Sequence, residues 1–356
     1  MFCGILALSF QLSSAQWTLV GDVYTSDQST HQSIALNSQG LPFVAFKDGS
    51  QFGKISVITL DNDVWVNVGT AGFSTEGFFG TDYQSLAFDS NDVPYVAFRD
   101  LNNGSKCSVM KFNGIEWEYV GPVGITTGAV GHVSLAIDSQ GLPHVAFRES
   151  PLADKCSVMR FDGSQWNYVG DSGFSSWNSS VAYVNLLIDD NDKLFVAYQE
   201  EIYDDGASVL TFDGSEWVYV GTPGFSGGST SYESLAIDDF GQLYIAYRDN
   251  ALSGKCTVMT YVDDAWEALG VAGISTGATS YTSLQIDYAG RVIVAFKDWA
   301  NGSRTSVKRF ENEEWTDVGS SGFSTASANY QDLAINALGH MFVAYEIGDV
   351  EVQRFV

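Results

Sequence analysis

Four short apolar runs follow one another along this chain, and the same set of four runs then starts again. Residues 134–170, SLAIDSQGLPHVAFRESPLADKCSVMRFDGSQWNYVG, show the set most clearly. Gly, Asp and Asn separate the runs, which is typical of β-strands joined by turns. No stretch of useful length has the apolar periodicity of an amphipathic helix. The pattern therefore predicts an all-β protein built from a repeated four-strand unit.

A tryptophan in the fourth run gives the length of the repeat. It recurs every 48 to 52 residues, at Trp17, Trp65, Trp117, Trp166, Trp217, Trp266 and Trp315. A fixed period in this range is typical of a solenoid, an array or a propeller. We expect each indole to pack between neighbouring units, because burying one removes about 150–250 Å² from water.

The first two strands of the unit read SLAID and PYVAF, or close variants. The second strand contains an Ala in all seven units. The second run is apolar throughout instead of at alternate positions, so both of its faces are expected to be buried. The turn between the two strands ends in Gly in five units and in Asp92 or Asp192 in the others. We expect these two Asp residues to take the positive φ of such a turn.

The third strand reads KCSVMKF and the fourth reads W-x-x-V-G, with a tight turn between them. Cys107, Cys156 and Cys256 share one position of the third strand. Equivalent positions in different units are too far apart for a disulfide, so we interpret these cysteines as small buried core residues.

The two ends of the chain each supply part of a unit. Residues 350–356 form a third strand with no fourth strand after it, and residues 17–21 form a fourth strand with no other strand before it. Sharing one unit between the ends closes a ring and leaves only short, protected edges. The sequence therefore predicts a seven-bladed β-propeller of four-stranded antiparallel blades over residues 16–356, in which the N-terminal strand completes the last blade.

Residues 1–15 differ from the repeat. An apolar run over residues 2–12 is followed by Ser13, Ser14 and Ala15, which predicts the back half of a secretory signal peptide, although no Lys or Arg precedes the run. The run is too short to cross a membrane as a helix. We therefore expect a secreted or cell-surface protein.

The negative charge of the chain makes some classes of binding partner unfavourable. Its formal net charge is −26 and its pI is about 4.2. Nucleic acids and anionic membranes attract Lys and Arg patches, so neither is expected as a partner. We expect a monomeric ring with no membrane insertion.

The amino-acid sequence of the repeat resembles that of a known group of proteins. The segment 273–298, GISTGATSYTSLQIDYAGRVIVAFKD, is similar to secreted bacterial repeat proteins of the Bacteroidetes type that form seven-bladed β-propellers. The resemblance covers nearly the whole chain after residue 15. It implies export and extracellular work, and it implies no uniform activity.

Strand direction places the two–three loops and the long four–one loops on one face, where binding sites on a rigid scaffold usually lie. An aromatic residue or His stands near the start of strand one: His31, Tyr83, His132, Tyr183, Tyr232, Tyr281 and Tyr330. A polar pair follows strand two: Lys47-Asp48, Arg99-Asp100, Arg148-Glu149, Gln199-Glu200, Arg248-Asp249 and Lys297-Asp298. The four–one loop carries Gly-Phe/Ile-Ser/Thr in six units.

Two interpretations of these recurring residues stay open. They form a ring of ligand-binding pockets, or they pack and pair to hold the blades and loops together. Recurrence does not separate the two, because duplication copies core and site alike. Trp177 and Trp299 lie in loops of the same face, at positions where the other units have no Trp. Either they form a contact patch, or they reflect sequence variation of the loops without a function.

Nothing in the sequence points to a particular enzyme. No zinc-binding HExxH or phosphate loop is found, and we assign no catalytic residue, metal or cofactor. His144 and His340 fall on the side of the short turns. The leading hypothesis is a non-enzymatic module that binds a glycan or a protein in recognition or adhesion. The alternatives are a glycoside hydrolase or lyase on a propeller scaffold and a structural surface module.

Overall fold

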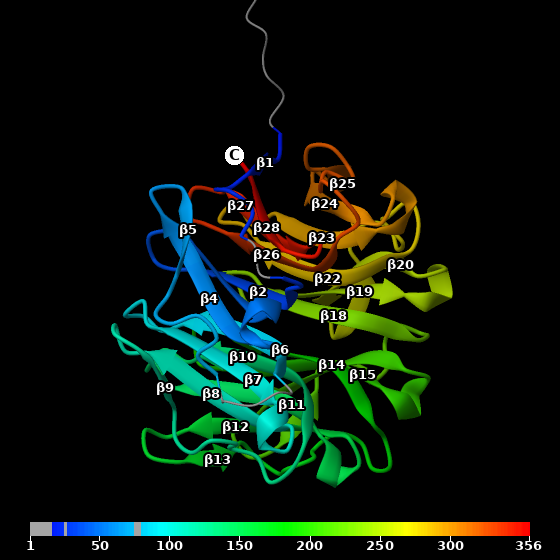
Figure 1. Cartoon of the computed structure of the whole chain (residues 1–356). Coiled ribbons are helices and arrows are strands. Elements are labelled where there is room, and N and C mark those ends of the chain that lie inside the picture. Colours follow the sequence, from blue (N-terminus) through cyan, green and yellow to red (C-terminus); the bar gives the residue numbers. More distant parts are fainter. Residues whose placement is uncertain (1–15, 25–26, 75–79) are drawn as a thin grey trace, which may run out of the picture.

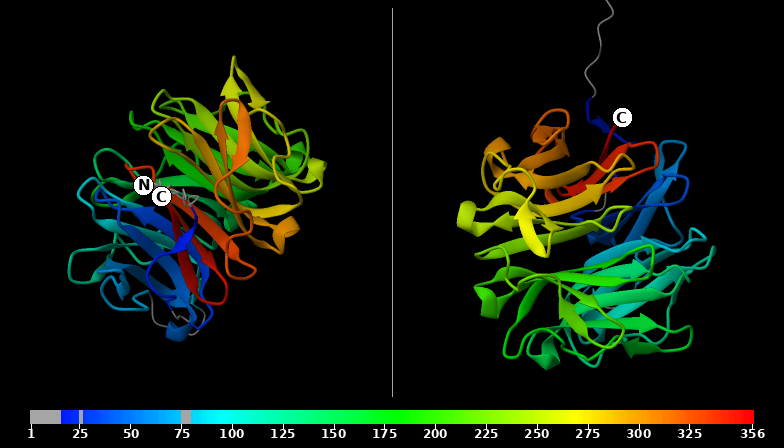
Figure 2. Two further views of the ribbon diagram at one scale, coloured as in Figure 1. Left: turned by 90° about the horizontal axis from the view of Figure 1, so that it is seen from above. Right: turned by 180° about the vertical axis from the view of Figure 1, so that it is seen from behind.

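Seven four-stranded antiparallel sheets stand in a ring, and the chain passes through them in sequence order (Figures 1 and 2). The computed structural model describes residues 16–24, 27–74 and 80–356. The predicted signal segment, residues 1–15, lies outside the described residues. Within the described residues, no helix is both long and apolar enough to cross a membrane.

Each sheet is one blade, numbered here from 1 to 7 along the chain. Blade 1 contains β2 (Thr30–Leu36), β3 (Pro42–Asp48), β4 (Lys54–Asp61) and β5 (Val64–Asn67). Blade 2 contains β6 (Thr81–Phe88), β7 (Pro94–Asp100), β8 (Lys106–Phe112) and β9 (Trp117–Tyr119). Blade 3 contains β10 (Val130–Ile137), β11 (Pro143–Glu149), β12 (Lys155–Phe161) and β13 (Trp166–Tyr168).

The remaining blades follow the same order. Blade 4 contains β14 (Val181–Ile188), β15 (Leu194–Glu200), β16 (Gly206–Phe212) and β17 (Trp217–Tyr219). Blade 5 contains β18 (Thr230–Ile237), β19 (Leu243–Asp249), β20 (Lys255–Val262) and β21 (Ala265–Ala268). Blade 6 contains β22 (Thr279–Ile286), β23 (Val292–Asp298), β24 (Arg304–Glu311) and β25 (Glu314–Asp317).

Blade 7 joins the two ends of the chain, as predicted. It contains β26 (Asn329–Ile335), β27 (Met341–Glu346), β28 (Val350–Phe355) and β1 (Thr18–Leu19). In the antiparallel pair of β1 and β28, Thr18 lies opposite Arg354 and Leu19 lies opposite Gln353. The red C-terminal strands accordingly lie beside the blue start of the chain in Figure 1. The predicted seven-bladed propeller and its closure are confirmed.

A short 3₁₀ turn follows strand two in the first six blades. These turns are η1 (Gly49–Gln51), η2 (Leu101–Asn103), η3 (Ser150–Leu152), η4 (Glu201–Tyr203), η5 (Asn250–Leu252) and η6 (Trp299–Asn301). Each ends at a residue with left-handed φ, such as Gly104 or Gly302. The turns belong to the two–three loops, so they lie on the face that the sequence analysis proposed for binding.

The core is divided into apolar clusters between neighbouring blades, one cluster to each of the seven interfaces. The Ala of each strand two is fully buried, as are Cys107, Cys156 and Cys256. Desolvation by burial raises the pKa of all three thiols. The prediction that these cysteines are core residues is confirmed.

The recurring tryptophans link the blades, as predicted. Each indole Nε1 donates a hydrogen bond to a strand-four carbonyl of the preceding blade, at 2.7 to 2.9 Å. The Phe of the Gly-Phe-Ser segment stacks on the next Trp in four interfaces, for example Phe73 on Trp117 with ring centroids 4.2 Å apart. The same indole therefore contributes both apolar area and a buried hydrogen bond.

Two local features were only partly predicted. Asp92 and Asp192 have φ of 61° and 60°, as expected, and each also accepts hydrogen bonds from a Ser in the turn of the preceding blade. Strand one begins three or four residues earlier than the apolar pattern indicates, because a register shift interrupts it in every blade. The extra residues of this shift position the candidate site.

Candidate functional site

The seven residues near the start of strand one form a closed ring of side chains around the axis, which we call the aromatic collar. Its members are His31, Tyr83, His132, Tyr183, Tyr232, Tyr281 and Tyr330. Each ring contacts both of its neighbours, with centroids 4.5 to 5.5 Å apart. Such tilted and edge-on contacts are favourable geometries for aromatic pairs.

A β-bulge holds every member of the collar in place. Each sits at the register shift of its strand and has φ between 50° and 61°, a left-handed conformation that is uncommon for a bulky residue. Bulges re-aim side chains and are frequent beside functional sites. The bulge explains why the collar residues depart from the in-and-out alternation of an ordinary strand.

An axial cavity of about 280 Å³ adjoins the collar. Residues from all seven inner strands line it, including four collar tyrosines. Next to the collar, a side chain from each inner strand accepts a hydrogen bond from the backbone of the next blade, as Ser33 does from Leu86 N at 3.1 Å. These bonds continue around the ring and end with Asp332 accepting from Ile34 N at 2.8 Å.

The first residue of each polar pair lies across the sheet from the residue before a collar member. In four blades this residue reaches the next blade. Lys47 Nζ lies 3.0 Å from Asp82 Oδ1, and Lys297 Nζ lies 2.6 Å from Asn329 Oδ1. Gln199 and Arg248 instead donate to the backbone carbonyls of the next blade. In these blades the side chain therefore bridges two blades.

Arg99 and Arg148 make no such bridge among the described residues. The residues of the next blade that would meet them are Gly131 and Ala182, neither of which has a polar side chain. Arg148 Nε lies 3.5 Å from Asp154, and Arg99 Nε is buried without a hydrogen-bond partner in the described part of the chain. A Cβ on Gly131 would lie 3.2 Å from the Arg148 guanidinium. Gly131 therefore leaves room for Arg148 beside the collar.

His132 is the collar residue between these two arginines. Burial, followed by the charges of Arg148 and Arg99, lowers its pKa to about 4. His132 is therefore neutral at physiological pH. Arg99, His132 and Arg148 bring two guanidinium groups and a neutral imidazole to one sector of the collar, in blades 2 and 3.

The second residues of the polar pairs lie elsewhere. Asp100, Glu149, Asp249 and Asp298 are all buried. Glu149 Oε2 accepts a hydrogen bond from Ser157 at 2.7 Å, and Ser157 Oγ in turn accepts one from Gly173 N at 2.8 Å. Asp249 and Asp298 make the same link through Thr257 and Ser306. Glu149, Asp249 and Asp298 therefore anchor the four–one loops that follow their own blades.

The two loop tryptophans lie in different surroundings. Trp299 is 52% exposed, and the Arg248 guanidinium lies 5.5 Å from its ring centroid, in a cation–π contact. Trp177 is 86% exposed, with Lys155 Nζ 5.1 Å from its ring. Trp177 lines a separate cavity of about 490 Å³ to which no collar residue contributes. The structure thus brings Trp299 to Arg248 and keeps Trp177 apart from the collar.

Sequence reasoning found the collar and the cations but not what makes one sector different. Gly131 and Ala182 offer no polar side chain to Arg99 and Arg148, in contrast to Asp82 and Asn329, which meet Lys47 and Lys297. The signal was present as a break in the repeat, since the other blades have Thr, Asp, Ser or Asn at this position. Without the register of the bulge, that position could not be paired with the arginines.

Comparison by sequence finds no relative: no family model matches the chain, and no curated protein does. Comparison by structure finds many. A lectin from Burkholderia pseudomallei has a TM-score of 0.65 at 14% identity, over 92% of this chain and 96% of the lectin. Virginiamycin B lyase from Staphylococcus aureus has a TM-score of 0.63 at 8% identity, over 96% of this chain and 100% of the lyase.

A third similar structure is an extracellular domain assigned to a one-component system of B. thetaiotaomicron. It has a TM-score of 0.62 at 10% identity, over 95% of this chain and 39% of that one. At such identities the likeness concerns the fold, and one fold serves many functions. The proteins that share this fold include both binding proteins and enzymes, and the chain is a seven-bladed β-propeller like them.

Proposed function

We propose that this propeller is a non-enzymatic binding module whose ligand is a glycan with acidic groups, bound on the collar face. The carrying observation is the pair of guanidinium groups of Arg99 and Arg148, which flank His132 without bridging to another blade. Guanidinium groups form strong charge-assisted hydrogen bonds with carboxylates and sulfates. The collar rings are half-buried, and their exposed apolar surface can pack against the CH groups of a sugar.

The overall charge of the protein supports the same assignment. A chain with a net charge of −26 repels polyanions in general. Cations at the mouth of the axis therefore have to act locally, on a ligand that reaches the collar. The recurring cations Lys47, Arg99, Arg148, Arg248 and Lys297 surround the collar. Four of the five are linked to other groups in the structure, so Arg99 is the cation most open to a ligand.

A glycan microarray with acidic and neutral glycans tests the proposal. The purified protein is expected to bind carboxylated or sulfated glycans without altering them. Arg99→Gln is expected to weaken this binding roughly tenfold to a hundredfold, because a hydrogen bond to a charged group is worth about 1.5–3 kcal/mol. Titration calorimetry with the best glycan measures the change.

Arg304→Gln is the matched control. Arg304 starts β24 on the same face, is exposed, and lies outside the collar, so this variant removes the same charge and is expected to keep the affinity. Equal loss in both variants would indicate a general charge effect. If no glycan on the array binds, the proposal is contradicted.

A lyase is the second candidate, and His132 is the observation that favours it. A neutral imidazole between two guanidinium groups can accept the proton next to a uronate carboxylate that the arginines neutralise. The sugar oxygen at the neighbouring carbon then leaves, and a carbon–carbon double bond forms. Incubation with uronate-containing polysaccharides and measurement of the ultraviolet absorbance of that double bond decides between turnover and binding alone.

We also propose that the protein works outside the cell. The apolar run and small-residue exit of residues 1–15 support this, as does an extracellular domain among the similar structures. Expression of the whole chain in a bacterium, with mass spectrometry of the exported protein, tests it. The expected mature N-terminus follows Ala15, and a protein that stays in the cytoplasm with residues 1–15 intact would contradict it.

A further inference from the structure

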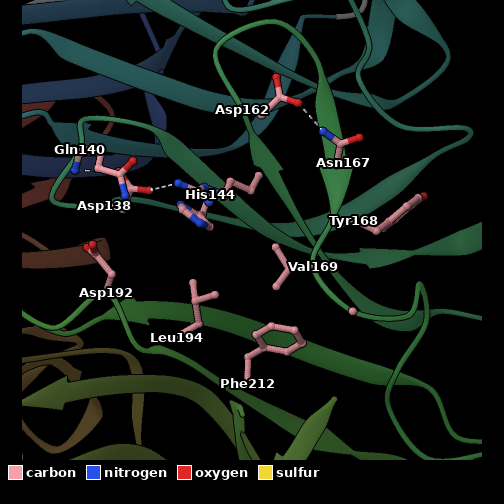
Figure 3. A pocket seen from close by; sticks show the side chains of 12 residues that line it. Asp138, Gln140, His144, Asp162, Asn167, Tyr168, Val169, Asp192, Leu194 and Phe212 are labelled. Carbon is pink, nitrogen blue, oxygen red and sulfur yellow. Dashed lines mark hydrogen bonds and ion pairs between the residues drawn. The ribbon is translucent and has the colours of Figure 1, made fainter. Parts of the chain in front are cut away.

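A cavity of about 450 Å³ lies between blades 3 and 4, on the side of the short turns. Figure 3 shows the side chains that line it. Polar groups of blade 3 stand on one side, among them Asp138, His144 and Asn167. Leu194 and Phe212 of blade 4 stand on the other. None of the collar residues lines this cavity.

A row of three polar residues crosses blade 3 at this cavity. His144 of β11 lies opposite Arg160 of β12, and Arg160 lies opposite Asn167 of β13. Their side chains face blade 4, because Ala146 and Val158, each two residues away from the row on β11 and β12, pack in the core between blades 3 and 4. The sheet register therefore places an imidazole, a guanidinium and an amide side by side.

In blades 1 and 4 the corresponding row carries apolar or small side chains. Blade 1 has Phe43, Thr59 and Val66 in these positions. Blade 4 has Phe195, Thr211 and Val218. The threonines use their hydroxyl to bond a carbonyl of strand two. Blade 3 thus exchanges a large aromatic residue for a smaller, polar one.

The polar groups of the cavity include both donors and acceptors. Arg160 Nη2 lies 3.0 Å from Asp138 Oδ2, while its Nε is buried without a partner among the described residues. His144 is 4% exposed, and its Nδ1 lies 3.2 Å from the Leu142 carbonyl. With the Nδ1 proton used there, Nε2 is left as an acceptor. Burial lowers the pKa of His144, so the ring is neutral at physiological pH.

Carboxylates add acceptors at the rim. Asp162 accepts a hydrogen bond from Asn167 Nδ2 at 2.8 Å, and Asp192 accepts from Ser139 N and Oγ, both at 2.7 Å. Hydrogen bonds from Gln165 N and from Ser164 lower the pKa of Asp162 to about 2, and the bonds from Ser139 lower the pKa of Asp192. Three carboxylates and one guanidinium leave a negative balance, which disfavours an anionic ligand.

The opposite wall is apolar and fixed in shape. Phe212 packs against Trp217, with ring centroids 5.5 Å apart, and Trp217 donates a hydrogen bond to the Val169 carbonyl. A Cβ on Gly170 would lie 3.0 Å from Phe212. The glycine therefore lets the chain pass close to the phenyl ring.

We propose that this cavity binds a neutral saccharide. A sugar presents hydroxyls that both donate and accept hydrogen bonds, and it presents apolar CH groups on its ring faces. The cavity offers both kinds of polar partner opposite an apolar wall, in a volume within the range of small-molecule sites. The site lies apart from the collar and does not depend on the function proposed for it.

Saturation-transfer NMR with glucose, galactose, mannose, fucose, N-acetylglucosamine and their disaccharides tests the proposal, followed by titration of the best ligand. The wild-type protein is expected to transfer saturation to at least one of these sugars. The double variant His144→Phe/Arg160→Thr is expected to bind it at least tenfold more weakly. Phe and Thr occupy these positions in blades 1 and 4, so the variant fills the cavity with residues that the fold already accepts.

Two further variants make the result specific. Arg309→Thr makes the same exchange in the corresponding row of blade 6 and is expected to keep the affinity. Asn167→Val changes an exposed position of the row that is Val in blades 1 and 4, and it is expected to weaken binding without loss of stability. Arg99→Gln is expected to leave this binding unchanged, which separates the site from the collar.

Three outcomes would overturn the proposal. They are no saturation transfer to any of the sugars, equal affinity in the wild type and the double variant, and a loss of affinity caused by Arg99→Gln alone. Binding of acidic glycans at the collar together with no binding of neutral sugars would contradict this site only. The reverse result would contradict the collar only.

Discussion

Glu233 is a carboxylic acid at a position that three other inner strands fill with Gln32, Gln84 and Gln331. It is 6% exposed, and desolvation raises its pKa to about 8. Glu233 Oε1 accepts a hydrogen bond from Thr230 Oγ1. In blade 2 the equivalent pair is also bonded, but there Gln84 Nε2 donates to Thr81 Oγ1. In these blades the position therefore holds a hydrogen-bonding group without a charge.

We predict that Glu233→Gln stabilises the protein at alkaline pH. The unfolded carboxyl has a pKa near 4.5 and the folded one near 8, so the folded state holds the proton more tightly. The stability that this proton provides is complete below the unfolded pKa and is lost as pH rises through the folded pKa. The variant is expected to gain about 3–5 kcal/mol over the wild type at pH 8.5 and less than about 1 kcal/mol at pH 5, as measured by urea unfolding at both pH values.

Gln84→Glu serves as the reciprocal control. It places an acid in the equivalent site of blade 2 and is expected to create the same loss of stability between pH 5 and pH 8.5. A constant difference between Glu233→Gln and wild type at the two pH values would contradict the assignment of a buried, protonated Glu233.

Residue chemistry was only partly predictable from the sequence. The collar and the cations recur at fixed places in the repeat, so the sequence identified them as one set. It did not separate Arg99 from Lys47, because the difference lies in Gly131 and Asp82 across the blade boundary. For Glu149 it left open a ligand-binding role and a structural role, and the structure shows the residue buried and bonded to Ser157.

The short strand β1 has no hairpin turn to its neighbour, unlike every other fourth strand. Pairing over two residues holds it to β28, together with the contacts of Trp17. The indole stacks on Phe323 at 4.2 Å and donates to the Val318 carbonyl at 2.7 Å. Trp117 makes the matching contacts to Phe73 and Val68 across the boundary between blades 1 and 2. Its own blade, blade 2, is formed by one continuous stretch of chain.

We predict that Trp17→Ala destabilises the protein by about 3–5 kcal/mol, the usual loss for a large buried aromatic residue. Trp117→Ala is the matched control and is expected to cost no more, because the turn after β8 still holds β9 in place. Thermal and urea unfolding measure both. An unchanged melting temperature for Trp17→Ala would contradict the role of β1 in closing the ring.

At the scale of elements, strand two and strand three were the easiest to predict. Their apolar runs are long and buried on both faces, as in residues 143–149. Strand one was predicted too short, because the bulge at residues such as Tyr281 places an aromatic residue in a left-handed conformation. No local pattern of hydrophobic and polar residues indicates such a bulge. Its effect on the ring appears only when all seven strands converge.

The whole ring is closed by repeated contacts instead of by one special interface. Indole–carbonyl hydrogen bonds and axial side chain–backbone hydrogen bonds each occur at all seven blade boundaries. The boundary between blades 7 and 1 differs in using Asp332, whose pKa burial raises to about 6. The fold was predictable because each contact follows from a residue that recurs with the period of the repeat.

We predict that a circular permutant keeps the fold. Phe161 and Trp166 flank a turn of four residues in blade 3, with ring centroids 5.5 Å apart. Trp17 and Phe355 have the same separation, and the chain already supplies Val356 and Gln16 between them. A Gly-Ser link should therefore complete an equivalent turn, with new ends between Gly214 and Ser215 in an exposed turn of blade 4.

The permutant is expected to melt within about 5 °C of the wild type, as measured by calorimetry. Its control has the same Gly-Ser link but new ends within β19, in the core of blade 5, and is expected not to fold. Loss of the fold in the first permutant would show that the boundary between blades 7 and 1 is not equivalent to the others.

The union of β1 with β28 also sets the order in which this molecule can be completed during biosynthesis. Thr18 bonds to Arg354, 336 positions further along. A ribosome adds about 5–20 residues per second, so the earliest strand waits tens of seconds for its partner. During that time the nascent chain carries an unpaired edge at each end of a growing arc. Translation of β28 is therefore the step that allows both edges to be removed at once.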